Sequence, residues 1–499
     1  MWQVLAGLPA SLAAGALSGV ATALAFPPHD VGLLAFFSLI PLALVFRAGK
    51  GPQVAVAAGV FGLVFFGLLF PWIHLFGTAA YVLLVTLETA FVVVFLVVGL
   101  ALRRRLPPAL TPLAFGTAYL AGEFLRSHTP IGGFPWGGLG YTQHDHAAIL
   151  RLAAYTGVWG VTLLIAAVNA ILAEALVALV SAPGRALRLL ALAAALVLAP
   201  ALLPVSQPNG APMTLALVQR QPPAQDPAQG SAQEQSLRSE AALTRSVAAR
   251  KVGLVVWPES SFDNDPLSTA SLAGPLLQSI RATGAAFVVG ASVDAPGPRF
   301  RNESLFIRPD GTLAAQYVKM HLVPFGEYVP GRRFLASWIH ELDKVPADGV
   351  AGTSPTVFSL PQGKFGTVIC YETAYPELVG SFVARGARMI VVSTNNASYR
   401  RTPASAQMVA ISQLRAAEQR MWVAQSALTG ISAVIAPTGQ VVERTKLFDS
   451  QVLTPTVRFA TTRTPYGRYG DWLPAVLFVV ALAMTAGGPL RTERTGRAG

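Results

Sequence analysis

The chain has 499 residues, of which 53% are hydrophobic and 12% are charged, with a formal net charge of +12 and one cysteine. The charged share is about half that of ordinary soluble domains. A lone cysteine excludes a disulfide within the chain. A basic chain could bind nucleic acid, but no basic-aromatic patch or binding motif is present, so we expect no nucleic-acid partner.

Long apolar blocks fill most of the first 204 residues, and a membrane-spanning helix needs about 20 largely apolar residues. We predict eight spans, at about 4–25, 32–46, 53–74, 80–102, 108–124, 158–181, 187–204 and 472–488. A soluble domain of this length could not bury eight such helices. Because no Lys or Arg precedes Arg47, the first block lacks the positive start of a signal peptide, and we predict an uncleaved span.

The arginines and lysines between the predicted spans indicate the direction of crossing, since they concentrate in cytoplasmic loops. With a cytoplasmic N-terminus, ten lie on the cytoplasmic side: Arg47, Lys50, Arg103, Arg104, Arg105, Arg185, Arg188, Arg491, Arg494 and Arg497. Only Arg126 and Arg151 lie in the opposite short loops. We therefore predict a seven-span membrane domain at 1–204, an extracytoplasmic domain at 205–470, and a last transmembrane helix with a basic cytoplasmic tail at 471–499.

The segment 205–470 has the pattern of alternating short strands and helices. Strands are predicted at 213–219, 252–260, 285–293, 365–370 and 387–394, and helices at 231–250 and 403–425. Hairpins are predicted at 304–317 and 430–445, with Pro-Asp-Gly and Pro-Thr-Gly at their turns. Helices that alternate with apolar strands indicate a layered α/β domain.

Three of the predicted strands end on a reactive side chain: Glu259 follows LVVWP, Lys319 follows AAQYV, and Cys370 follows TVI. A carboxylate and a thiol can act as base and nucleophile, and a nearby ammonium would lower the thiol pKa and bind an oxyanion. The ordinary alternatives are a solvated turn residue for Glu or Lys and a buried small hydrophobe for Cys. The spacing matches no local motif, so spacing alone does not establish a site.

Three function classes remain open for a membrane protein with such a domain. They are a membrane acyltransferase, a membrane-tethered amidase or nitrilase with water as acceptor, and a transporter with 205–470 as an accessory domain. A transporter would favour paired broken helices and charged midplane residues in repeat halves, which we do not find. His144-Asp145-His146 has metal-ligand residue types without distant partners, so we expect no metal, and no cofactor.

The sequence around the three reactive residues resembles a known family. WPES at 257–260, KMHLVPFGEYVP at 319–330 and CYE at 370–372 resemble the Glu, Lys and Cys signatures of the nitrilase superfamily, and more narrowly those of its membrane-embedded branch, the apolipoprotein N-acyltransferases. GGFPWGGLGYTQ at 132–143 and TPYGRYGDW at 464–472 resemble segments that flank that family's membrane spans. One stretch departs from it: NNASY at 395–399 stands where the family usually has an Asp-Ala-Trp-Phe-like run.

This resemblance implies a nitrilase-like α/β/β/α sandwich on an eight-helix transmembrane body. It implies transfer of a fatty acyl chain from a membrane phospholipid to the free α-amine of the lipidated N-terminal cysteine of lipoproteins, the final step of lipoprotein maturation. The implied partners are a phospholipid acyl donor, a diacylglyceryl-modified lipoprotein acceptor and membrane lipids. The implied protein is a monomer in the bacterial inner membrane, with its catalytic domain on the periplasmic side.

The same resemblance implies a role for each site residue. Cys370 would form an acyl-thioester in a ping-pong reaction, Glu259 would serve as the base, and Lys319 would stabilise the oxyanion. Supporting or substrate-binding roles fall to three more residues: Glu327 would orient the ammonium, and Tyr371 and Glu372 would shape the second substrate's site.

Overall fold

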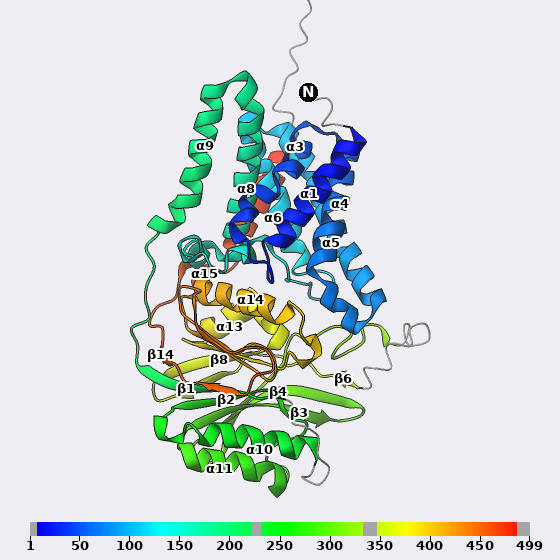
Figure 1. Ribbon diagram of the computed structural model, residues 1–499. Helices are drawn as coiled ribbons and strands as arrows, with labels where there is room; N and C mark the ends of the chain where they lie inside the picture. The colour runs from blue at the N-terminus through cyan, green and yellow to red at the C-terminus, as the bar shows by residue number, and fades with distance from the viewer. Residues whose placement is uncertain (1–6, 222–230, 333–346, 487–499) are drawn as a thin grey trace, which may run out of the picture. The chain divides into compact units, whose positions relative to one another are not determined.

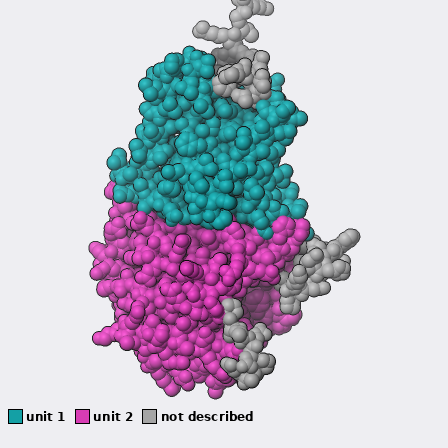
Figure 2. Space-filling view, viewed as in Figure 1, with its two compact units in different colours: residues 1–71, 79–203, 471–499 teal, residues 72–78, 204–470 magenta. Residues whose placement is uncertain are grey.

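The computed structural model describes residues 7–221, 231–332 and 347–486, so the predicted tail arginines Arg491, Arg494 and Arg497 lie outside the described residues (Figure 1). The chain divides into two compact units (Figure 2). Unit 1 comprises residues 1–71, 79–203 and 471–499, and unit 2 comprises residues 72–78 and 204–470.

Unit 1 is helical throughout its described part. Its helices are α1 (Leu8–Leu24), α2 (Ala35–Ser38), α3 (Ile40–Ala48), α4 (Gly51–Leu69), α5 (Thr78–Arg105), α6 (Thr111–Arg126), α7 (Ala147–Leu150), α8 (Ala153–Ser181), α9 (Pro183–Leu198) and α16 (Trp472–Ala486). Proline sets several of these boundaries, because it cannot donate within a helix and restricts the residue before it. The predicted span at 53–74 accordingly stops at Leu69, before Pro71.

Four helical segments of the described residues are long and apolar enough to cross a membrane: Gly51–Leu69, Thr78–Arg105, Ala153–Ser181 and Pro183–Leu202. The sequence predicted eight spans. Leu8–Leu24, Gly32–Ala48 and Trp472–Met484 are shorter apolar helices, and α6 has 16 residues. These four additional spans therefore stay predictions, while the four long apolar helices indicate a membrane protein.

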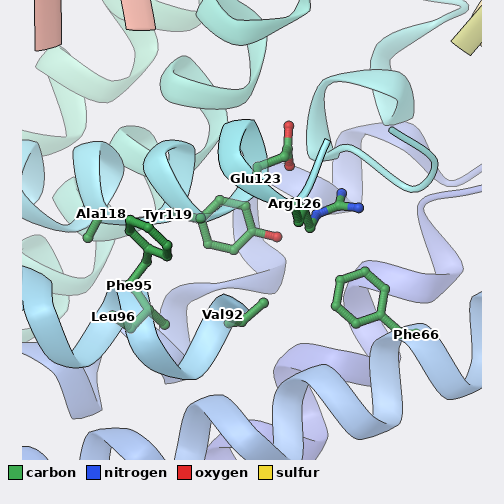
Figure 3. A pocket seen from close by; sticks show the side chains of 9 residues that line it. Phe66, Val92, Phe95, Leu96, Ala118, Tyr119, Glu123 and Arg126 are labelled. Carbon is green, nitrogen blue, oxygen red and sulfur yellow. The ribbon is translucent and has the colours of Figure 1, made fainter. Parts of the chain in front are cut away.

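The buried acidic side chains Glu88, Glu123 and Glu174 of unit 1 have charged or polar partners. Arg126 Nη1 lies 2.7 Å from Glu88 Oε2, and Arg47 Nε lies 2.7 Å from Glu174 Oε1. Glu123 accepts hydrogen bonds from Thr162 Oγ1 and from the Leu139 N–H, at 2.6 and 2.8 Å. Figure 3 shows Glu123 and Arg126 at the edge of a small pocket that is otherwise mainly apolar. Pairing of this kind offsets the cost of burying charge among membrane helices.

Unit 2 contains two β-sheets. The strands are β1 (Pro212–Gln219), β2 (Leu254–Phe262), β3 (Ala286–Ala295), β4 (Arg299–Ile307), β5 (Leu313–Val318), β6 (Asp348–Gly349), β7 (Val357–Leu360), β8 (Gly363–Ile369), β9 (Ile390–Thr394), β10 (Val423–Ala427), β11 (Ala433–Ile435), β12 (Val441–Arg444), β13 (Gln451–Leu453) and β14 (Thr456–Arg458). The first sheet has the order β13-β1-β2-β3-β4-β5, with β14 beside β1 and β6 beside β4, and the second has the order β12-β11-β10-β9-β8-β7. In each sheet the central strands, β1-β2-β3 and β8-β9-β10, are parallel.

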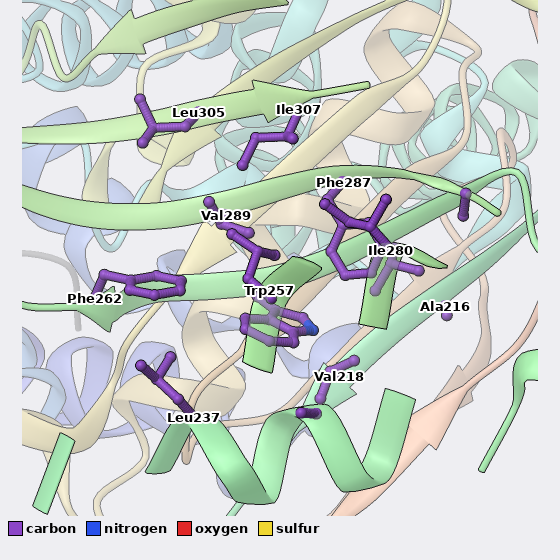
Figure 4. Packing of buried hydrophobic residues seen from close by; sticks show 14 of the residues in the cluster. Ala216, Val218, Leu237, Trp257, Phe262, Ile280, Phe287, Val289, Leu305 and Ile307 are labelled. Atoms are coloured by element: carbon purple, nitrogen blue, oxygen red, sulfur yellow. The ribbon is translucent and has the colours of Figure 1, made fainter. Parts of the chain in front are cut away.

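Helices cover the outer face of each sheet (Figure 1). They are α10 (Ala232–Arg245) and α11 (Ala270–Thr283) on the first sheet, and α13 (Pro376–Ala384) and α14 (Ala404–Gln419) on the second, with the short α15 (Pro465–Tyr469) beside α13 and α14. Trp257, Phe262 and Phe287 from the first sheet pack with Leu237 of α10 and Ile280 of α11 in one buried cluster (Figure 4). The result is an α/β/β/α sandwich, and this layered architecture was predicted.

Polar side chains join the two sheets at their contact. Ser426 Oγ on β10 donates to the carbonyl oxygens of Val218 and Val256, at 3.1 and 3.3 Å. Gln219 Oε1, at the end of β1, accepts from Ser432 Oγ and Thr445 Oγ1, at 2.8 and 2.6 Å. Buried polar groups that are hydrogen-bonded across the contact fix the position of one sheet on the other, because a shift would leave donors unpaired.

Most predicted strands occur at the predicted places, but one helix is shorter than expected. The predicted helix at 403–425 ends at Gln419, where Arg420 adopts a left-handed conformation, and β10 follows it. The apolar residues at 421–427 fit either a helix or a buried strand, so periodicity alone did not separate the two.

Candidate active site

Three strands of unit 2 carry the reactive side chains. Glu259 lies on β2, Lys319 directly follows β5, and Cys370 directly follows β8. The first two strands belong to one sheet and the third belongs to the other, so the site forms where the sheets face each other. All three residues are buried, with exposed fractions of 5% for Glu259, 1% for Lys319 and 8% for Cys370.

The Lys319 ammonium lies between two carboxylates. Its Nζ is 3.3 Å from Glu259 Oε1 and 2.8 Å from Glu327 Oε1. Asn302 Nδ2 donates to the same two oxygens, at 2.7 and 2.9 Å, and Glu327 Oε2 accepts the Val323 N–H at 2.8 Å. The predicted supporting residue Glu327 therefore contacts the ammonium, and Asn302 is a member of the site that the sequence analysis missed.

Glu259 is held at an irregularity in its strand. The pairing of β2 with β3 is interrupted between Trp257 and Phe262, and Ser260 adopts a φ of 59°. Gly290 on β3 makes room for this bulge, since a Cβ there would lie 2.5 Å from Glu259 Cα. The bulge re-aims the Glu259 carboxylate away from the ladder, which is a common use of bulges beside active sites.

Cys370 occupies a sharp turn between β8 and a short 3₁₀ helix, Cys370–Ala374. Its φ is 54°, a left-handed conformation that costs free energy for a residue with a side chain. The thiol Sγ lies 3.9 Å from Asn396 Oδ1, its hydrogen-bond acceptor, and Thr394 Oγ1 donates to the same oxygen at 2.7 Å. The turn thus presents the sulfur at the end of the strand, toward residues that follow β9.

Burial and the nearby charges set the protonation of the site. Burial and the Glu259 charge raise the pKa of the Cys370 thiol to about 12, which outweighs the lowering by Lys319. The sequence analysis expected Lys319 to lower the thiol pKa, and Lys319 does act in that direction, although burial and Glu259 outweigh it. Burial by itself lowers the pKa of Lys319, but Glu259 and Glu327 raise it well above its usual value. The site therefore holds an ammonium and a neutral thiol at neutral pH, and the thiol needs a base.

Glu372 joins the segments that carry Lys319 and Cys370. Its Oε1 accepts from Tyr317 Oη at 2.8 Å and from the backbone N–H groups of Met320 and His321 at 2.6 and 3.0 Å. Its Oε2 accepts the Ile369 N–H at 2.8 Å. Burial raises the pKa of Glu372 to about 7, against the lowering by these N–H donors. Glu372 is fully buried and joins these segments through its four hydrogen bonds, and its role at the second substrate's site stays a prediction.

Tyr371 belongs to an aromatic cluster beside the nucleophile. Its ring meets that of Tyr375 edge-on, with centroids 5.2 Å apart, and the two hydroxyls are 3.0 Å apart. His321 stacks on Tyr375 with centroids 4.1 Å apart. Burial lowers the pKa of His321, so this imidazole is neutral at neutral pH. These rings form an aromatic wall that begins at Tyr371, the residue after Cys370.

The stretch 395–399, where the sequence departs from the resembled family, contributes directly to the site. The Asn395 N–H donates to Glu259 Oε2 at 2.8 Å, and Asn396 contacts the thiol. Tyr399 ends a short 3₁₀ helix, Ala397–Tyr399, and its ring packs edge-on against those of Trp72 and Phe76. The sequence singled out this stretch only as a departure, because nothing local ties residues after β9 to the ends of β2 and β8.

Two families match this sequence. Residues 18–171 match the apolipoprotein N-acyltransferase N-terminal domain, and residues 214–465 match the carbon-nitrogen hydrolase family. The second match covers half of the chain and contains Glu259, Lys319 and Cys370.

Curated relatives match over nearly the whole length. An apolipoprotein N-acyltransferase from Azotobacter vinelandii is 32% identical over 96% of this chain and 95% of its own length. One from Geobacter metallireducens is 29% identical over 91% of each chain. Among solved structures, an amidase from Nesterenkonia sp. is 20% identical with a TM-score of 0.37, over 53% of this chain and 98% of its own.

Proposed function

Since the chain belongs to the apolipoprotein N-acyltransferase family, we propose that it transfers a fatty acyl chain from a membrane phospholipid to the free α-amine of the lipidated N-terminal cysteine of lipoproteins. The observation that supports this best is the buried Glu259, Lys319 and Cys370 cluster at the ends of three strands. We propose that the protein lies in the bacterial inner membrane, with unit 2 on the periplasmic side.

In the first half-reaction, the Cys370 sulfur attacks the ester carbonyl of the phospholipid. Its pKa of about 12 means that the thiol is neutral, so Glu259 takes the proton as the S–C bond forms. The Lys319 ammonium, with backbone N–H groups near Cys370, stabilises the negative oxygen of the tetrahedral intermediate. The C–O bond then breaks, and Glu259 returns the proton to the lysophospholipid oxygen, which leaves an acyl-thioester on Cys370.

In the second half-reaction, the α-amine of the lipoprotein attacks the thioester. Glu259 takes a proton from the attacking nitrogen, the C–N bond forms, and the C–S bond breaks. The sulfur recovers its proton from Glu259. A covalent intermediate that separates the two substrates in time gives ping-pong kinetics. Glu327 bonds to Lys319, and Asn302 bonds to Glu259 and to Glu327, so these two residues position Lys319 and Glu259 through both steps.

A tethered hydrolase with the same residues differs only in the acceptor. Water is far more concentrated than any lipoprotein amine, so the acyl-enzyme of a transferase must be protected from water by apolar walls. The aromatic wall of Tyr371 and Tyr375 beside Cys370 suits such protection, as do the long apolar helices that would bring a lipid donor.

Mass spectrometry of the purified full-length protein tests the proposal. After incubation with phospholipid, Cys370 should carry one acyl mass, and Cys370→Ala should carry none. The acyl-enzyme should persist for minutes without acceptor and decay quickly with a diacylated lipopeptide that has a free α-amine. An N-acetylated lipopeptide should not speed the decay, because its nitrogen is no longer nucleophilic. Equal decay with and without the free-amine lipopeptide would establish the hydrolase instead.

A further inference from the structure

The strand that carries the base changes face at Glu259. In a regular strand, residues two apart point to the same face, so Trp257, Glu259 and Ser261 would all point to one side of the sheet. Trp257 packs against helix α10 on the outer side (Figure 4), and the Ser261 hydroxyl lies 3.0 Å from Glu240 Oε1 on the same helix. Glu259 instead accepts from the N–H of Asn395, which follows a strand of the other sheet. The base alone is therefore turned over.

Two residues of α10 hold the strand on either side of the turned residue. Thr244 Oγ1 accepts from the Trp257 indole N–H at 2.9 Å, two residues before Glu259. Glu240 accepts from the Ser261 hydroxyl, two residues after Glu259. Glu240 and Thr244 are four residues apart, so they lie on one face of the helix, and both are fully buried. The helix therefore fixes β2 at two points that flank the base.

The turned conformation needs such support. Ser260 adopts a φ of 59°, a left-handed conformation that costs free energy for a residue with a side chain. The Ser261 hydroxyl also lies 2.8 Å from the Pro258 carbonyl oxygen, so it closes the turn from 258 to 261. Burial raises the pKa of Glu240 to about 7, against the lowering by Arg220. At pH 8 the Glu240 carboxylate is therefore ionised and can only accept, so the Ser261 hydroxyl is the donor.

A buried ion pair supplies the acceptor for Ser261. Arg220 directly follows β1, and its Nε lies 3.1 Å from Glu240 Oε1. Both residues are buried, with exposed fractions of 6% and 0%. Burying two charges costs free energy, and such a pair often contributes no more stability than apolar residues of the same size. The pair does hold the Glu240 oxygen at a fixed place behind the turn.

We propose that Glu240 is a positioning residue for the base Glu259, and that it acts through the hydroxyl of Ser261. The Glu259 carboxylate takes and returns a proton in both half-reactions, so its direction sets their rates. A displacement of about 1 Å at a reacting group can cost about a hundredfold in rate. The proposal deepens the proposed acyl transfer and rests on it for the two half-reactions.

The substitution Ser261→Ala tests this role, because it removes one oxygen and leaves the ion pair in place. Acyl-enzyme formation from phospholipid at pH 8 should fall about tenfold, by loss of a hydrogen bond to a charged group. In a Glu259→Gln background the same substitution should have no further effect, because no base is left to position. A parental rate in Ser261→Ala, or equal fold losses in the two backgrounds, would overturn the proposal.

Two paired replacements separate positioning from stability. Arg220→Gln with Glu240→Gln removes both charges and keeps a side-chain oxygen for Ser261, so its rate of acyl-enzyme formation should stay within about threefold of the parent. Arg220→Met with Glu240→Leu also removes both charges but leaves no acceptor, so its rate should fall about tenfold at a parental unfolding midpoint. Equal rates in the two double variants would overturn the proposal.

Ser279→Ala is the matched control, since this buried hydroxyl donates within helix α11, to the Pro275 carbonyl oxygen at 2.8 Å. Its rate of acyl-enzyme formation should equal that of the parent protein.

Alkylation of Cys370 by iodoacetamide at pH 8 needs no lipid substrate and distinguishes the two possible failures. It should rise about twofold or more in Ser261→Ala, because the Glu259 charge that raises the thiol pKa is held less closely. In the Glu259→Gln background, Ser261→Ala should leave it unchanged. This pattern in a protein that never forms an acyl-enzyme would retain the positioning of Glu259 and reject the acyl transfer.

Discussion

Glu259 has two opposite effects on the nucleophile. Its charge raises the pKa of the Cys370 thiol, yet the same carboxylate is the base that the neutral thiol requires. Glu259→Gln should therefore increase alkylation of Cys370 by iodoacetamide at pH 8, by about tenfold, because a nearby like charge is removed. Acyl-enzyme formation from phospholipid should fall by about a hundredfold or more. Quenched alkylation assays measure the alkylation rate, and mass spectrometry measures the rate of acyl-enzyme formation on the same samples.

The pH dependence of Cys370 alkylation in the parent protein is the reference for this prediction. With a thiol pKa of about 12, its alkylation rate should rise about tenfold per pH unit from 7 to 10 without a plateau. Glu443→Gln, on the exposed strand β12, is the control and should change neither rate. A fall of both rates in Glu259→Gln would assign Glu259 a structural role only.

Lys319 has little room for a larger cation. Its Nζ lies within hydrogen-bonding distance of two carboxylates, and the side chain is 1% exposed. Lys319→Arg should lower acyl-enzyme formation by about a hundredfold, because a planar guanidinium cannot replace a compact ammonium at an oxyanion. Lys364→Arg, an exposed lysine on β8, should be neutral. Rates within twofold of the parent in Lys319→Arg would remove Lys319 from the oxyanion role.

At the scale of secondary-structure elements, Glu372 connects the end of β5 to the end of β8 through four accepted hydrogen bonds. In Glu372→Gln, one terminal atom becomes an NH₂ group that faces an N–H donor. We expect a loss of about 1–3 kcal/mol in unfolding free energy at pH 8.5, where the carboxylate is ionised. Tyr317→Phe removes only one of the four donors and should cost less. Equal unfolding midpoints for the parent and Glu372→Gln would contradict this role.

The segment after β9 depends on close packing against Gly430. A Cβ at position 430 would lie 2.7 Å from both Cβ and Nδ2 of Asn396. Gly430→Ala should therefore displace Asn396 from the Cys370 thiol and slow acyl-enzyme formation by about tenfold, because the thiol loses its hydrogen-bond acceptor. Gly380→Ala on helix α13 meets nothing within 4 Å and should keep the parental rate. Parental activity in Gly430→Ala would show that the Asn396 contact does not matter for the rate.

Local sequence was informative where a strand ends on a reactive residue. The apolar runs before Glu259, Lys319 and Cys370 predicted their strands, and a strand end limits where a side chain can lie. Asn302 was missed because it lies inside β4. In an alternating strand pattern, a polar residue predicts a side chain that faces the solvent. Asn396 was missed as a site residue because only the parallel pairing of β8 with β9 brings the end of β9 to the thiol. Contacts between distant segments leave no local pattern.

At the scale of the whole molecule, the chain combines membrane helices with a domain of the carbon-nitrogen hydrolase family. A hydrolase that meets soluble substrates has no need of the helices. Both substrates of the proposed reaction are lipids held in a bilayer, so the membrane part can supply them in two dimensions. This argument requires unit 2 to lie on the side of the membrane where lipidated proteins are completed, which makes the orientation of the chain the decisive property.

The orientation can be measured with a reporter enzyme that is active only outside the cytoplasm. The bias of arginine and lysine predicts that the N-terminus and the loop with Arg103, Arg104 and Arg105 lie inside. Fusions at Gly132 and at Pro208 should therefore be active, and fusions after Arg105 and after Arg491 should be inactive. Seven spans before Pro208 and an eighth before Arg491 are needed for this pattern. If one of the shorter helices does not cross the membrane, every fusion beyond it changes from active to inactive or the reverse. The first fusion that changes identifies that helix. An inactive fusion at Pro208 would put the catalytic unit in the cytoplasm and reject a lipoprotein substrate on the outer face.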